Sequence, residues 1–152
     1  MRRQPGFTII ELMIAVAIVA ILAGIALPSY TNYITRGKIQ EGTTSLLSLR
    51  VKMEQWYQDN RAYPTTCGAA TTATQLAVPT LKYFVISCPT LSLNPPAYTI
   101  QADGTDGALL GLQIQINEAN QRITKTVPAA WGPTAAAGLP KQCWVQKTNG
   151  DC

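Results

Sequence analysis

The strongest pattern in the sequence is an apolar run near its start. Residues 7–27 read FTIIELMIAVAIVAILAGIAL and contain a single charged residue, Glu11. As an α-helix these 21 residues span about 30 Å, which is the thickness of the hydrocarbon core of a bilayer. The run therefore predicts a helix that crosses a membrane or lies in the core of a helix bundle.

A second helical pattern follows Pro28, in which apolar positions recur at spacings of three and four. These positions are Ile39, Gly42, Leu46, Leu49, Met53 and Trp56. Residues three and four apart share one helix face, so this stripe is expected to cover a sheet. Because Pro64 forbids continuation, we expect one helix from about Phe7 to about Asn60, with its apolar half protruding and its other half packed.

The rest of the chain alternates apolar and polar residues, as strands do. Strands are expected at 81–88, 98–102, 110–116 and 122–127, and turns at 103–107 and 117–121. Residues 65–79 lack periodicity and are predicted to be a loop. The predicted fold class is α+β, in which a long N-terminal helix packs on an antiparallel sheet of about four strands.

Charge around the apolar run predicts its orientation. Arg2 and Arg3 precede the run and no comparable cluster follows it, so the N-terminus is expected in the cytoplasm. A cleaved secretory signal is the competing interpretation, since Gly24 and Ala26 form a small-x-small pair. Pro28 is a poor neighbour for that cut, and a disposable signal has no use for Glu11, a carboxylate that is costly in a membrane.

Composition argues against an enzyme. The chain has no histidine, no glycine-rich phosphate loop and no nucleophile elbow, so we expect no catalytic residues and no cofactor. The acidic segment 103–107 lacks the ligand spacing of a calcium loop, so it is interpreted as a turn and no metal site is expected. Arg2 and Arg3 contribute half of the net charge of +4, and the other basic residues are scattered, so a nucleic-acid partner is left open without being indicated.

Four cysteines follow the apolar run, at Cys67, Cys88, Cys143 and Cys152. No Cys-x-x-Cys pair is present, which disfavours zinc and thioredoxin-like chemistry, whereas an even number beyond an export segment favours disulfides. Four cysteines allow three pairings. Proximity in the sequence favours pairing Cys67 with Cys88 and Cys143 with Cys152.

The N-terminus closely resembles that of type IV pilin precursors. It has a short basic leader ending in Gly6, then Phe7, Glu11, a long apolar helix and Pro28 followed by Tyr30 and Tyr33. The resemblance implies that a prepilin peptidase cuts between Gly6 and Phe7 and methylates the new amine of Phe7. It divides the chain into a leader (1–6), a membrane or filament-core helix (7–28) and a head (29–152) outside the cytoplasm.

Two features of the helix are expected to serve assembly. Glu11 can be protonated, or its charge can be neutralised by the amine of its own Phe7 or by that of a neighbouring subunit. Only pairing with a neighbouring subunit sets the register between subunits. Gly24 and Pro28 predict a local bend or a melted turn, although such residues are also tolerated in membrane helices with no special role.

The expected function is therefore that of a structural subunit, a major or minor pilin of a type IV pilus. Its partners would be copies of itself and other pilins, prepilin peptidase and the inner-membrane assembly machinery, and the filament would serve adhesion, twitching motility or DNA uptake. The precursor would lie in the inner membrane before export to the extracellular pilus. Residues 53–64 also resemble the minor, PilE-like pilins. The alternatives are a pseudopilin of a type II secretion system and a membrane-anchored protein that binds DNA or a surface.

Overall fold

The structure is a computed structural model that describes residues 6–68 and 75–152. The chain forms two compact units, Met1–Ile34 and Thr35–Cys152. The leader predicted at 1–6 lies outside the described residues apart from Gly6.

A single helix, α1 (Ile9–Asn60), runs without a break through both units. It ends where Arg61 adopts a left-handed conformation (φ 56°), with its N–H donating to the Tyr57 carbonyl at 2.8 Å. A left-handed residue after the last turn, with Pro64 close behind, is a common helix end. The helix predicted to end near Asn60 is confirmed.

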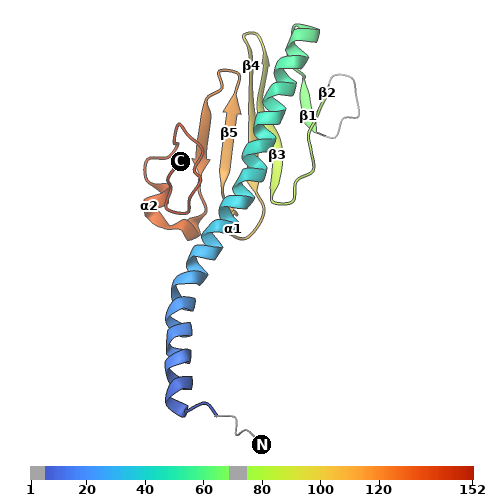
Figure 1. Ribbon diagram of the computed structural model, residues 1–152. Helices are drawn as coiled ribbons and strands as arrows, with labels where there is room; N and C mark the ends of the chain where they lie inside the picture. The colour runs from blue at the N-terminus through green and yellow to red at the C-terminus, as the bar shows by residue number, and fades with distance from the viewer. Residues whose placement is uncertain (1–5, 69–74) are drawn as a thin grey trace, which may run out of the picture. The chain divides into compact units, whose positions relative to one another are not determined.

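The second unit contains a four-stranded antiparallel sheet. Its strands are β3 (Phe84–Leu93), β4 (Pro96–Gly104), β5 (Gln113–Asn117) and β6 (Arg122–Thr126). They are hydrogen-bonded in the order β3-β4-β5-β6, so the predicted meander is confirmed. Figure 1 shows the later part of α1 lying across one face of this sheet.

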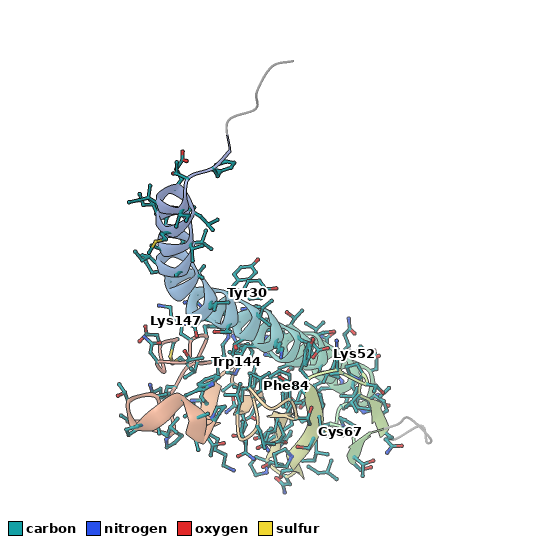
Figure 2. All side chains as sticks on the ribbon, turned by 90° about the horizontal axis from the view of Figure 1, so that it is seen from below. Tyr30, Lys52, Cys67, Phe84, Trp144 and Lys147 are labelled. Carbon is teal, nitrogen blue, oxygen red and sulfur yellow. A yellow bond between two sulfur atoms is a disulfide. The ribbon has the colours of Figure 1, made fainter. Side chains whose placement is uncertain are left out.

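The core lies between α1 and that face of the sheet. The helix contributes Ile39, Leu46, Leu49 and Met53, and the sheet contributes Tyr98, Ile100, Ala102, Ile114 and Ile116. The alternation predicted for β4 therefore reflects burial, whereas in β5 Gln115 is buried together with the isoleucines on either side of it. At one point the layers are especially close, because Phe84 packs against Gly42; Figure 2 places Phe84 between the helix and the sheet. A Cβ atom at residue 42 would lie 2.9 Å from carbons of that ring.

Several predicted strand boundaries in the head are wrong. The strand expected at 110–116 begins at Gln113, because the Leu112 N–H bonds back to the Leu109 carbonyl in a turn, and Leu110 is 66% exposed. Alternation of leucine with glycine imitated a strand there. The strand expected to end at Cys88 continues to Leu93 past a bulge at Pro89, which cannot donate to the ladder.

The segment predicted as a loop at 65–79 contains two short strands. They are β1 (Thr66–Gly68) and β2 (Gln75–Ala77), paired in parallel. Three-residue strands are too short to show periodicity in a sequence. Residues 69–74 of the predicted loop lie outside the described part of the chain.

Disulfides link Cys67 to Cys88 and Cys143 to Cys152, the pairing expected from proximity. The first ties β1 to β3. The second closes the C-terminal segment, which reaches the sheet through Thr124: its hydroxyl donates to the Cys143 carbonyl and accepts from the Val145 N–H. Between β6 and this segment lie a 3₁₀ turn, η1 (Ala129–Trp131), and the short α2 (Gly132–Ala136).

Candidate processing and assembly site

The first turn of α1 is closed by a reciprocal contact between Thr8 and Glu11. The Glu11 N–H donates to the Thr8 hydroxyl oxygen (3.3 Å), and Glu11 Oε2 accepts from the Thr8 N–H (3.1 Å) and hydroxyl (2.9 Å). This is a capping box, in which two residues satisfy N–H groups that the first helical turn leaves unpaired. Sequence reasoning missed Thr8, although Thr-x-x-Glu before an apolar run is the signal for it.

The capping box also determines what the Glu11 carboxylate contacts within the chain. In the uncleaved chain the Phe7 nitrogen is part of a peptide bond, and the Glu11 carboxylate is held by Thr8. Pairing of Glu11 with a Phe7 amine stays a prediction. Both Thr8 donors converge on Oε2. Gly6 and Phe7 precede the capping box, and cleavage and methylation at these two residues stay predictions.

The helix beyond this turn exposes its large apolar side chains. Its large apolar residues from Ile9 to Leu27 are more than half exposed, and Phe7, which precedes the turn, is 91% exposed. Among the described residues one helix, α1, is long and apolar enough to cross a membrane. Burial of such side chains is worth on the order of 1.5–3 kcal/mol each, so this surface strongly favours an apolar environment.

Gly24 and Pro28 do not interrupt the helix. The backbone is helical through both residues, so the melted turn expected there is absent. Proline has no N–H, and Gly24 is the residue four positions before Pro28, so the Gly24 carbonyl lacks its usual helical donor. A bend that keeps the helix intact stays a prediction.

Polar contacts fix the helix to the head beyond residues 7–28, the assembly segment. Lys38 Nζ lies 2.6 Å from Asp106 Oδ2, and this contact lowers the pKa of the Asp106 carboxyl. Glu41 accepts the N–H groups of Lys82 and Tyr83 at 3.0 and 2.9 Å. These contacts hold the start of the packed half of α1 against the loops next to β3 and β4.

A buried tyrosine makes a further contact at the far end of the helix. The Tyr98 hydroxyl donates to Glu54 Oε1 at 2.8 Å. Burial and then the bond to Glu54 raise the pKa of Tyr98 well above its ordinary value. Its ring also meets Tyr63 edge-on, with the ring centroids 4.7 Å apart. These residues stabilise the head, and none lies in the assembly segment.

Comparison with known proteins identifies the family. A family model described as "Type IV minor pilin ComP, DNA uptake sequence receptor" matches residues 28–111, and the "Prokaryotic N-terminal methylation motif" matches residues 1–27. The chain is 34% identical over 130 residues to a fimbrial protein of Moraxella nonliquefaciens, covering 84% of this chain and 77% of the relative. The chain belongs to the type IV pilins.

Other relatives match a smaller part of the pilin. The type IV major fimbrial protein FimA of Dichelobacter nodosus is 45% identical over 69 residues, which is 45% of this pilin and 42% of that protein. In structure, the pilin is similar to the non-core minor pilin PilV of Neisseria meningitidis, with a TM-score of 0.50 and 20% identity over 63% of this chain and 91% of that one. The second match shows a shared fold.

The family settles the broad functional class. The pilin is a subunit of a type IV pilus, and its family and relatives are structural proteins. The relatives and the minor-pilin family model named above belong to the pilus, one of the two filament systems considered from the sequence. Its methylation motif covers the segment in which the capping box and the exposed apolar side chains lie.

Proposed function

We propose that the pilin is made as a membrane-anchored precursor with a cytoplasmic N-terminus, is cut by a prepilin peptidase between Gly6 and Phe7, and is methylated on the Phe7 amine. Residues 7–28 then leave the bilayer and pack in the core of the pilus, while residues 29–152 form the exposed head. The observation that carries the proposal is the exposed apolar surface of residues 7–27, interrupted by a single carboxylate.

Neighbouring subunits would pack through a depression in the surface of the helix. Leu12, Val16 and Ala20 follow one another at intervals of four along α1, with Met13 and Ala17 beside them, and the five residues line a shallow apolar depression. Ridges and grooves of this spacing are how α-helices interlock. A side chain of a neighbouring helix would enter the depression where the small Ala17 and Ala20 leave room.

Glu11 would select the register of that packing. A carboxylate surrounded by apolar helices is costly unless it is paired, so a subunit in the correct stagger, whose Phe7 amine reaches Glu11, is favoured over one that is displaced. The capping box supports this role, because Thr8 holds the carboxylate in one place through Oε2. Apolar contacts would provide most of the affinity.

Mass spectrometry of sheared surface filaments tests processing and assembly together. We expect an abundant N-terminal peptide that begins at a methylated Phe7. A mature N-terminus near Ala26, or the absence of the chain from filaments made by cells that express it, would contradict the proposal.

The substitution Glu11→Gln separates the two roles of Glu11. Glutamine can take the place of glutamate in a capping box but cannot pair with an amine as a charge. We expect normal cleavage and about a tenfold or greater loss of the chain from filaments, equivalent to at least about 1.4 kcal/mol per subunit. Glu11→Asp, which keeps the charge, is the matched comparison. Wild-type incorporation of the Gln variant would rule out register selection by charge.

DNA uptake is a second candidate role for the filament, because the matching family model describes a DNA uptake sequence receptor. Binding of double-stranded DNA by purified full-length pilin, compared at low and high salt, tests it. A steep loss of affinity with salt would indicate contacts to several phosphates.

A further inference from the structure

The head contains a groove that the assembly proposal does not use. It has a volume of about 480 Å³ and lies between the turn that joins β5 to β6 and the C-terminal segment closed by Cys143–Cys152. The side chains that matter here are four amides, an arginine and a tryptophan: Asn120, Gln121, Gln142, Gln146, Arg122 and Trp144. A groove of this size suits a small ligand or one unit of a larger one.

Arg122 is held in place by the ring beneath it. Its guanidinium carbon lies 5.1 Å from the centroid of the Trp144 ring, and Trp144 is only 5% exposed. The indole N–H of Trp144 donates to the Gln115 carbonyl at 2.8 Å, which fixes the ring on the sheet. A guanidinium that lies over the face of a ring still has N–H groups to donate to a further partner, such as a carboxylate. Trp144 is labelled in Figure 2.

The amides around Arg122 are also partly held. Gln146 Oε1 accepts from Gln40 Nε2 at 2.7 Å, and Gln121 Oε1 accepts from Asn117 Nδ2 at 2.8 Å. Each of these two side chains therefore has its oxygen engaged and keeps an NH₂ group as a donor. Asn120 and Gln142 are exposed at the groove and provide both a donor and an acceptor. Such mixed donors and acceptors match hydroxyl groups.

The lining does not resemble a nucleic-acid site. It includes one basic side chain, whereas affinity for DNA comes from several phosphate contacts. The Trp144 ring is covered by Arg122 and protein, so no base can stack on it. One planar cation with several amides instead fits a ligand that carries one carboxylate and many hydroxyls.

We propose that this groove binds an acidic sugar unit of a surface polysaccharide, with the sugar carboxylate on Arg122 and its hydroxyls on the amides. The inference goes beyond assembly and requires only a folded head, so failure of the filament experiments would leave it standing.

The test is calorimetric titration of full-length pilin in detergent micelles with a glucuronate-containing tetrasaccharide. Maltotetraose serves as the neutral comparison and an oligothymidylate as the nucleic-acid comparison. We expect binding of the acidic tetrasaccharide alone. Arg122→Gln should weaken binding of the acidic tetrasaccharide at least tenfold. Arg122→Lys should weaken it by an intermediate factor, because lysine keeps the positive charge but lacks the paired N–H donors of the guanidinium.

Lys125→Gln is the matched control, because Lys125 is exposed on the same strand and does not line the groove. It should leave the affinity unchanged, and thermal melting should show that all variants are folded. No binding of the acidic tetrasaccharide, equal loss in the Lys125 and Arg122 variants, or tighter binding of the oligothymidylate would each overturn the proposal.

Discussion

Thr8 and Glu11 together have two roles at the start of α1. Their reciprocal hydrogen bonds satisfy N–H groups of the first turn and hold the carboxylate proposed to set the register. The charge is thus in place before any neighbour arrives. Because a fixed group loses less conformational freedom when it pairs, the local cap would also favour assembly.

The capping box is tested by Thr8→Val, which has nearly the same shape but no hydroxyl. We expect the first turn to lose about 1 kcal/mol, since the Glu11 N–H loses its acceptor. Hydrogen exchange in detergent micelles should then be faster at Glu11 by about fivefold, with residues after Ala20 unchanged. Thr8→Ser should restore protection. Equal exchange in all three proteins would show that the box contributes nothing.

At the scale of elements, the approach of α1 to the sheet depends on a missing side chain. Gly42 lies on the buried stripe that includes Ile39 and Leu46, and the Phe84 ring occupies the space where its Cβ atom would be. Alanine favours an α-helix more than glycine does, so helix propensity does not explain the glycine at residue 42. The close packing of Phe84 does. The helix and the sheet meet here through contact of the Phe84 ring with the backbone at Gly42.

Gly42→Ala should therefore destabilise the head, by about 1–3 kcal/mol, because Phe84 or the helix must shift. Gly37→Ala is the control, since nothing lies within 4 Å of a Cβ atom at residue 37 of the same helix. That substitution should stabilise the protein by about 0.5–1 kcal/mol. Urea unfolding followed by tryptophan fluorescence gives both values, and a loss of the same size at both positions would contradict the packing argument.

At the scale of the whole molecule, contacts between residues far apart in the sequence join the helix to the sheet. Lys38 and Asp106 are 68 residues apart, and Glu41 reaches the backbone of Lys82 and Tyr83. Lys38 also lies 5.0 Å from the centroid of the Tyr83 ring. Charge and hydrogen bonding thus supplement the apolar core at the edge where α1 enters the head.

The Lys38–Asp106 pair predicts a pH dependence. The pKa of Asp106 is lowered in the folded state, so its contribution to stability is present above the ordinary aspartate pKa of about 4 and is lost as the pH falls through the lower folded value. Asp106→Asn should lower the unfolding free energy at pH 7 and flatten its decline below pH 4. In a Lys38→Met background the same substitution should have a much smaller effect. If Asp106→Asn changed the unfolding free energy equally with and without Lys38, then Lys38 would not be the cause of the lowered pKa.

The apolar run, the stripe from Ile39 to Met53 and the alternation in β4 could be interpreted without a structure. Each is a periodic pattern that follows directly from helix or strand geometry and burial. The motif at Gly6, Phe7 and Glu11 was equally visible, because it is continuous in the sequence. The sequence by itself therefore determined the helix, the meander and the family.

Tertiary structure decided what depends on neighbours distant along the chain. Leu110 fits a strand pattern, yet the chain turns there because Leu109 and Leu112 are the leucines that reach the core. The parallel pairing of β1 with β2 and the groove under Arg122 arise in the same way, from segments brought together by the fold. No local pattern reports such contacts, since their energy depends on which surfaces meet.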